Sequence, residues 1–288
     1  MFIETCLSGL KERAMSDRLY EILKQAQQDE NVRGAVLYGS RANQEIQPDP
    51  YQDYDIYFIV QAVERFDVSS ISGVKLSFEP SRVYPALFPD ECVYLMLFED
   101  DSRVDLTVCT LKTFLEKHNK GELMRCLLDK DGKIPSLNQS DASRTWVSPM
   151  DENMFQETCS EFFWEIQNMV KGLKRDALSY AMFIRDISLR DMLNRLIDQC
   201  IGIRNDFKVS VGTLGKFRKI YLTQNEYELY QKTYRSNTQQ DRIDSLFYML
   251  DLFSSIGKWV AAARRFDYPE EKEQVVRDYL QRVGLTGR

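Results

Sequence analysis

Short apolar runs separated by polar segments fill the first half of the chain and predict a mixed sheet. Runs at residues 35–37 and 54–60 are read as two strands around a polar segment. Residues 92–98 and 103–109 flank a short acidic turn, which is typical of a β-hairpin. Apolar spacing predicts helices over residues 17–28 and 114–128, with a loosely packed extension before the first. Residues 61–91 contain several prolines and are expected to form loops with short strand pieces.

From residue 148 onward, apolar residues recur every three or four positions, which is the period of an α-helix. Ser148 and Pro149 are predicted to start the first helix, as N-cap and first helical residue. Further helices are predicted over 177–203, after a capping box at Thr223, over 243–260 and over 269–283. The predicted fold is α+β, with a mixed-sheet domain at residues 1–146 and an all-α bundle of about five helices at 147–288.

Composition narrows the class of protein. The 288 residues are 43% hydrophobic, which is enough for two cores, and no apolar span has the length of a membrane helix, so we expect a cytoplasmic protein. The net charge of −6 disfavours a nucleic-acid partner and suits a small cationic substrate. Six scattered cysteines predict reduced thiols. The single histidine, His118, lies in a polar run and is interpreted as a solvated helix end rather than a catalyst.

Candidate chemistry gathers around the first two predicted strands. Gly39 permits a tight turn, and the amides around Gly39 and Ser40 can point together at a phosphate. In the following strand, Asp53 and Asp55 share one side, with their Cα atoms about 7 Å apart. Two like charges on one face favour a divalent cation such as Mg²⁺, which prefers oxygen ligands. The alternative is that both are solvated charges at a strand edge.

A third acidic residue lies in the second strand of the predicted hairpin. Asp105 is flanked by Val104 and Leu106, and an unpaired carboxylate at such a position would be costly if buried. Strand pairing could bring Asp105 beside Asp53 and Asp55, as a ligand of the same metal or as a base. The alternative is a half-exposed strand with Asp105 on its solvated side.

Several short runs are informative through their order and spacing. They are Leu37-Tyr-Gly-Ser-Arg-Ala-Asn43, Tyr51-Gln-Asp-Tyr-Asp-Ile56, Leu97-Phe-Glu-Asp100, Val104-Asp-Leu-Thr107, Leu127-Leu-Asp-Lys-Asp131, Glu161-Phe162, Val170-Lys-Gly-Leu173, Lys216-Phe217 and Tyr268-Pro269. Together they resemble the aminoglycoside 6-adenylyltransferases. The resemblance covers nearly the whole chain after about the first ten residues and implies a polymerase-β-like nucleotidyltransferase domain followed by a helical domain. It also implies transfer of AMP from ATP to an aminoglycoside hydroxyl, with release of pyrophosphate.

The resemblance implies roles for individual residues. Asp53 and Asp55 would bind Mg²⁺, Asp105 would be the third carboxylate, and Gly39-Ser40 would bind the nucleotide phosphates. Positive groups that could meet the triphosphate are Arg41 and Lys216; the alternative for each is a surface ion pair. Acidic side chains could also pair with the guanidinium groups of a streptomycin-like substrate, although surface positions are the simpler interpretation; the candidates are Glu79, Glu99 and Glu161.

The chain departs from the family pattern at three places. Tyr38 stands where relatives carry an acidic residue before the glycine of L-E-G-S-R. The run Gly212-Thr-Leu-Gly-Lys-Phe217 keeps only the second of two lysines, and Ala181-Met-Phe-Ile-Arg-Asp186 replaces A-x-D-H-L-N. Because the three acidic residues are all present, these departures bear on the acceptor more than on the transfer chemistry.

Two other functions compete with aminoglycoside adenylylation. The acceptor could be a lincosamide, another metabolite or a protein hydroxyl. Alternatively, the chain could be a nucleotide-binding or scaffold protein that has lost its chemistry, although three mutually repelling acids are unexpected in such a protein. We expect a monomer.

Overall fold

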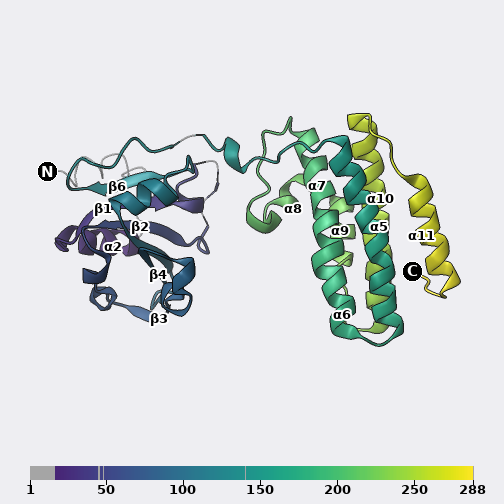
Figure 1. The fold of residues 1–288 in the computed structure, drawn as a ribbon, viewed down its shortest axis with the longest axis horizontal. Helices are drawn as coiled ribbons and strands as arrows, with labels where there is room; N and C mark the ends of the chain where they lie inside the picture. Colours follow the sequence, from purple (N-terminus) through teal and green to yellow (C-terminus); the bar gives the residue numbers. More distant parts are fainter. Residues whose placement is uncertain (1–16, 45, 48, 140, 288) are drawn as a thin grey trace. The chain divides into compact units, whose positions relative to one another are not determined.

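The computed structural model describes residues 17–44, 46–47, 49–139 and 141–287. The extension predicted before residue 17 lies outside these residues. Two compact units divide the chain at residues 1–144 and 145–288, two residues before the predicted boundary. The first unit holds a mixed sheet and the second is helical, as the α+β prediction required (Figure 1).

The sheet of the first unit has six strands in the order β3-β4-β5-β2-β1-β6. Neighbouring strands run antiparallel except β2 and β5, which are parallel. Bounds are β1 Val32–Tyr38, β2 Tyr54–Val60, β3 Val74–Phe78, β4 Glu91–Phe98, β5 Arg103–Thr110 and β6 Arg125–Asp129, with helices α2 Asp17–Gln28, α3 Pro80–Val83 and α4 Leu111–Thr113.

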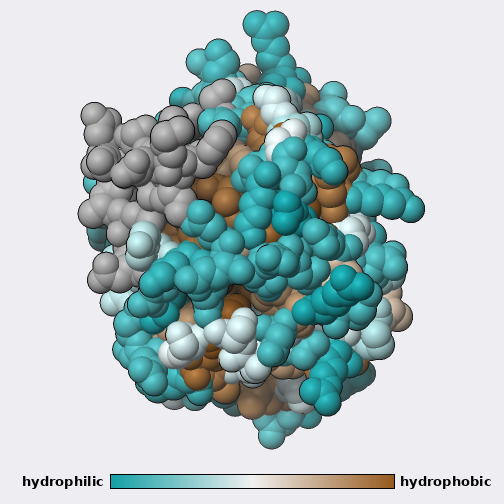
Figure 2. All heavy atoms as spheres, turned by 90° about the vertical axis from the view of Figure 1, so that its left-hand side faces the viewer, coloured by the Kyte–Doolittle hydropathy of each residue, from teal (hydrophilic) through white to brown (hydrophobic). Residues whose placement is uncertain are grey.

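Alternation along β2 supplies both faces of the sheet with apolar side chains. Ile56 and Phe58 pack with α2 on one face, whereas Tyr57 and Ile59 pack with Phe114 on the other. Successive side chains of a strand point to opposite faces, so one apolar run can fill two cores. The surface drawn in Figure 2 is mostly hydrophilic, with smaller hydrophobic patches.

The predicted hairpin of β4 and β5 and the helix at 17–28 are present, but the helix predicted over 114–128 is wrong. Only α4 and one turn of π-helix, Phe114–His118, are helical there. Residues 125–129 instead form β6, which pairs with β1 at the edge of the sheet. The apolar spacing alone predicted a helix here. The strand forms instead because its hydrogen bonds to β1, which is distant in sequence, stabilise it.

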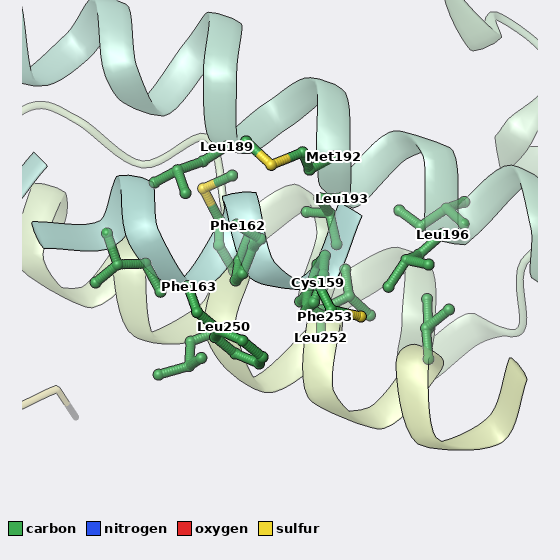
Figure 3. Packing of buried hydrophobic residues seen from close by; sticks show 14 of the residues in the cluster. Cys159, Phe162, Phe163, Leu189, Met192, Leu193, Leu196, Leu250, Leu252 and Phe253 are labelled. Atoms are coloured by element: carbon green, nitrogen blue, oxygen red, sulfur yellow. The ribbon is translucent and has the colours of Figure 1, made fainter. Parts of the chain in front are cut away.

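The second unit consists of helices packed around one apolar core. In Figure 3, Phe162 of α5 lies among side chains of two other helices, and it stacks on Phe253 with ring centroids 3.7 Å apart. The predicted second helix is interrupted by a π-helical segment, Ile184–Leu189. Bounds are α5 Glu152–Lys174, α6 Leu178–Phe183, α7 Arg190–Arg204, α8 Arg218–Tyr221, α9 Gln224–Lys232, α10 Gln239–Arg264 and α11 Glu270–Arg282.

The first helix of this unit begins later than predicted. Asp151, not Ser148, is the N-cap, and its carboxylate accepts a hydrogen bond from the Met154 amide. The side chain of Gln199 accepts from the Met150 amide at 2.9 Å and donates to the Ser148 carbonyl at 2.8 Å. Residues 148–150 are therefore held by α7, which the local sequence does not reveal. The capping box at Thr223 is present as predicted.

In the described part of the chain, none of the helices combines the length and the apolar character needed to cross a membrane.

Candidate active site

The carboxylates of Asp55 and Asp105 lie at the same level on two neighbouring strands. The register of β2 and β5 pairs Asp55 directly with Asp105. Paired residues of adjacent strands point to the same face. Asp53 precedes Tyr54, the first residue of β2, so its side chain is not placed by the strand register. The Asp105 side chain is 18% exposed, so it is not a freely solvated residue. Strand pairing thus brings Asp105 beside Asp55.

Gly39 lies directly against Asp55. The glycine has φ +70°, a conformation that side-chain-bearing residues rarely adopt, and it begins the 3₁₀ turn Gly39–Arg41 after β1. A Cβ atom at this position would lie 2.9 Å from Cγ of Asp55 and closer still to its Oδ2. The turn predicted to bind phosphates is therefore in contact with a predicted metal ligand.

Arg103 provides the positive charge among these acids. Its Nε and Nη2 donate to the two carboxylate oxygens of Asp105 at 3.0 and 2.8 Å, and its Nη1 lies 3.5 Å from Oδ2 of Asp53. The hydrogen bonds to Asp105 raise the pKa of the Arg103 guanidinium, and the charges of Asp53 and Asp55 act in the same direction. Sequence analysis missed Arg103, although the R-x-D spacing places it on the same face as Asp105.

The donor set suits a hard divalent cation, because it consists of carboxylate oxygens around a point already held by a positive group. In the part of the chain that the structure describes, no three acidic, histidine or cysteine side chains are arranged as a ready metal site. Asp105 is turned toward Arg103 instead. The chemistry of the carboxylates therefore fits a cation, and in this structure Asp53 and Asp105 both contact the Arg103 guanidinium.

Arg41 contacts the main chain that leads into β2. Its guanidinium donates to the carbonyls of Gln52, at 2.7 Å, and Asp53, at 3.1 Å, and stacks on the ring of Tyr54 at 3.8 Å. These contacts position the backbone of Asp53. Binding of phosphate by Arg41 stays a prediction, and so does the alternative of a surface ion pair.

Lys216 belongs to the second unit. It follows the short 3₁₀ segment Thr213–Gly215, and its Nζ lies 5.3 Å from the ring centroid of Phe217. Gly212 and Gly215 both have positive φ, so the loop turns tightly, as its glycines suggested. Whether Lys216 meets the nucleotide stays a prediction.

The rings of Tyr38, Tyr57 and His118 contact one another in series, beginning beside Asp55. Tyr38 pairs with Asp55 across β1 and β2 and stacks on Tyr57, with ring centroids 4.3 Å apart. The Tyr57 hydroxyl lies 3.2 Å from Nδ1 of His118, whose Nε2 lies 2.6 Å from a carboxylate oxygen of Glu91. His118 ends the helical turn Phe114–His118, as predicted, but its side chain is only 20% exposed, so the prediction that it is solvated is wrong. Burial raises the pKa of Tyr38 to about 12, with a contribution from Asp55, so its hydroxyl stays protonated at neutral pH.

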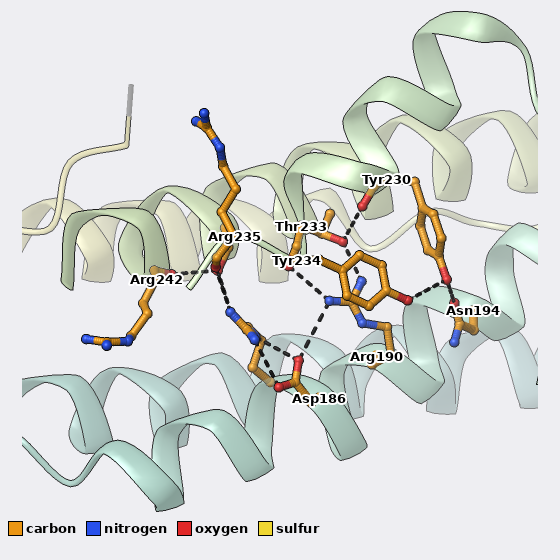
Figure 4. Close-up of polar contacts among 10 residues, drawn as sticks. Asp186, Arg190, Asn194, Tyr230, Thr233, Tyr234, Arg235 and Arg242 are labelled. Carbon is orange, nitrogen blue, oxygen red and sulfur yellow. Dashed lines mark hydrogen bonds and ion pairs between the residues drawn. The ribbon is translucent and has the colours of Figure 1, made fainter. Parts of the chain in front are cut away.

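The three acidic candidates for substrate binding lie in different surroundings. Glu79 precedes α3, Glu99 is exposed in the hairpin turn, and Glu161 is exposed on α5. Of these, Glu161 borders a hollow of about 390 Å³ that is also lined by Asp186 and Arg190. Figure 4 shows Arg190 in contact with Thr233, Asp186 and the ring of Tyr234.

Comparison with known proteins supplies the class of enzyme. A family model described as streptomycin adenylyltransferase matches residues 12–283. An aminoglycoside 6-adenylyltransferase of Bacillus subtilis is 30% identical over 86% of this chain and 90% of its own length. An aminoglycoside 6-adenylyltransferase from Campylobacter jejuni is 31% identical over 88% of this chain and 90% of its own length. One from Staphylococcus aureus is 30% identical over 87% of this chain and 92% of its own length.

These matches span both units and define the protein as a nucleotidyltransferase. Within that class, the chain belongs to the streptomycin adenylyltransferase family. A crystal structure of an aminoglycoside 6-adenyltransferase from Bacillus subtilis is also similar, with 26% identity, a TM-score of 0.48, and coverage of 92% of this chain and 97% of that one.

Proposed function

We propose that the protein transfers AMP from ATP to a hydroxyl group of an aminoglycoside, with streptomycin as the first candidate. The names of the relatives support both the reaction and the class of acceptor. The observation that carries the proposal is the in-register pair of Asp55 and Asp105, with the Gly39 turn against Asp55. This arrangement supports the proposal because the residues proposed to bind the cation and the turn proposed to bind the phosphates meet at the ends of neighbouring interior strands.

Each group of residues has a separate role in the proposed reaction. Mg²⁺, held by Asp53, Asp55 and Asp105, would neutralise charge on the triphosphate and lower the pKa of the acceptor hydroxyl. The turn at Gly39 and Ser40 offers main-chain amides to the phosphates. Lys216 would add positive charge, and Arg41 would hold the backbone of Asp53 in place. The positive groups and the turn then act on ATP, while the carboxylates act on the cation.

The proposed reaction is a displacement at the α-phosphorus of ATP. The acceptor oxygen forms a bond to the α-phosphorus and loses its proton to a base, while the bond to the leaving phosphate oxygen breaks and pyrophosphate departs. The net charge of −6 suits a cationic acceptor such as an aminoglycoside. We place this activity in the cytoplasm, where ATP is available.

The test is to incubate the purified protein with MgATP and streptomycin, and to measure pyrophosphate together with the mass of the product. We expect a product heavier by one AMP and no turnover when the metal is chelated. Asp105→Asn should abolish turnover. The matched control is Asp101→Asn in the same hairpin, because Asp101 is 82% exposed and the asparagine tolerates its φ of 60°.

Other acceptors are separated by the same reaction. Turnover with a different aminoglycoside but not with streptomycin would keep the enzyme class and change the substrate. A lincosamide, another metabolite or a protein would appear as an AMP adduct when MgATP is added to a cell extract and the products are analysed by mass spectrometry. The absence of any adduct in all of these assays would refute the proposal.

A further inference from the structure

Arg103 contacts two of the carboxylates that are proposed as ligands of a divalent cation. It is the first residue of β5, two positions before Asp105, so strand alternation directs both side chains to one face. The guanidinium holds both oxygens of Asp105 and also approaches Asp53. One arginine thus bridges two of the three proposed cation ligands.

The contacts of Arg103 conflict with those of a cation. Both oxygens of Asp105 are engaged in a two-pronged hydrogen bond, so a cation that takes Asp105 as a ligand competes with the guanidinium for them. A guanidinium and a divalent ion in the same cluster would also repel each other. The Arg103 side chain is 47% exposed, so it has solvent into which it can move.

We propose that Arg103 is a built-in counter-ion, which neutralises the acidic cluster in the metal-free protein, is displaced when the divalent cation binds, and thereby sets the metal affinity. This inference rests on the proposed function in taking the three acids as cation ligands. In the absence of a cation, the arginine would compensate the repulsion among these like charges. It makes Arg103 a positioning residue for Asp105.

The expected effect follows from simple electrostatics. Removing Arg103 takes one positive charge away from the site and frees Asp105 to turn toward the cation. Because the arginine is half exposed, its interactions are partly screened, and we expect the cation to bind about tenfold more tightly to Arg103→Gln. The metal-free variant should melt at a lower temperature than the wild type, and saturating cation should close this gap.

The experiment uses Mn²⁺ as the probe, without nucleotide or aminoglycoside. Free Mn²⁺ is measured by electron paramagnetic resonance during titration of the full-length wild type and of Arg103→Gln. Arg82→Gln is the matched control, because it removes the same charge from an exposed position on α3. Arg103→Lys keeps the charge but not the two-pronged geometry, and it should bind Mn²⁺ with an affinity between those of the wild type and Arg103→Gln.

Tighter binding by Arg103→Gln, with no change in Arg82→Gln, supports the inference. Equal or weaker binding by Arg103→Gln and Arg103→Lys overturns it, as does an equal gain in Arg82→Gln, which would reflect net charge alone. The outcome is separate from that of the adenylylation assay. An active wild type with unchanged Mn²⁺ affinity in Arg103→Gln would refute the counter-ion role and leave the proposed function intact. Tighter Mn²⁺ binding by Arg103→Gln without any turnover by the wild type would support the counter-ion role and refute the proposed function.

Discussion

The substitution Gly39→Ala changes the turn after β1 in two ways. Alanine would have to keep φ near +70°, where its Cβ is crowded by its own backbone. The same Cβ would also lie 2.9 Å from Cγ of Asp55 and closer to Oδ2, so the carboxylate or the turn must shift. The first effect concerns stability, and the second concerns the geometry of the proposed active site.

The two effects have different magnitudes. A left-handed conformation costs a residue with a side chain about 1–2 kcal/mol, which should appear in the free energy of unfolding. Relief of the clash moves Asp55 by on the order of 1 Å, and a displacement of that size in an active site can lower the rate about 100-fold. We therefore expect a modest loss of stability and a large loss of adenylylation.

Gly132→Ala separates these effects. Gly132 has φ +65°, similar to that of Gly39, but an added Cβ would meet nothing within 4 Å. Both variants should lose about 1–2 kcal/mol in urea denaturation. Only Gly39→Ala should lose pyrophosphate release with MgATP and streptomycin.

Two results would refute this reasoning. Full activity in Gly39→Ala would mean that the contact between the turn and Asp55 has no part in the chemistry. An equal loss of activity in Gly132→Ala would mean that backbone strain alone disturbs the enzyme. Circular dichroism spectra should match the wild type in both variants, which excludes misfolding as the cause.

Three further substitutions test the packing, capping and charge of the helical unit. Phe253→Ala removes the ring stacked on Phe162 and should cost about 3–5 kcal/mol in urea denaturation; a loss below 1 kcal/mol would contradict the core assignment. Thr223→Ala removes the capping hydroxyl and should cost about 1 kcal/mol, whereas unchanged stability would deny the cap a role. Burial alone would raise the pKa of Glu273, but hydrogen bonds, led by Arg277, lower it below its usual 4.5. Stability from this carboxylate is present above that value and is lost as pH falls through the folded pKa, so Glu273→Gln should flatten the acid side of the melting-temperature profile; an unchanged slope would contradict this.

Local sequence was sufficient where the structure follows from backbone geometry. The apolar run at residues 54–60 forms the predicted strand, with Ile56 and Phe58 on one face and Tyr57 and Ile59 on the other. Most of the helices were predicted because their apolar stripe repeats over several turns. The motifs around Gly39 and the acidic residues identified the family because they depend on order and spacing alone.

Local sequence failed where a distant segment decides the conformation. Residues 125–129 became a strand because β1 offers an unpaired edge, and Gln199 delays the start of α5 by binding the main chain at residues 148–150. His118 faces Tyr57 and Glu91 rather than solvent for the same reason.

The pattern of residues along the chain is enough to predict the α+β organisation and the family, and it singles out Asp53, Asp55 and Asp105. The folded chain adds the alignment of Asp105 with Asp55, the contacts of Arg41 with the main chain before β2, and the pairing of Arg103 with two of the acids. The physical reason is the range of the interactions involved. Periodicity records which face of an element is apolar, whereas strand order, register and ion pairing depend on contacts between residues far apart in the chain.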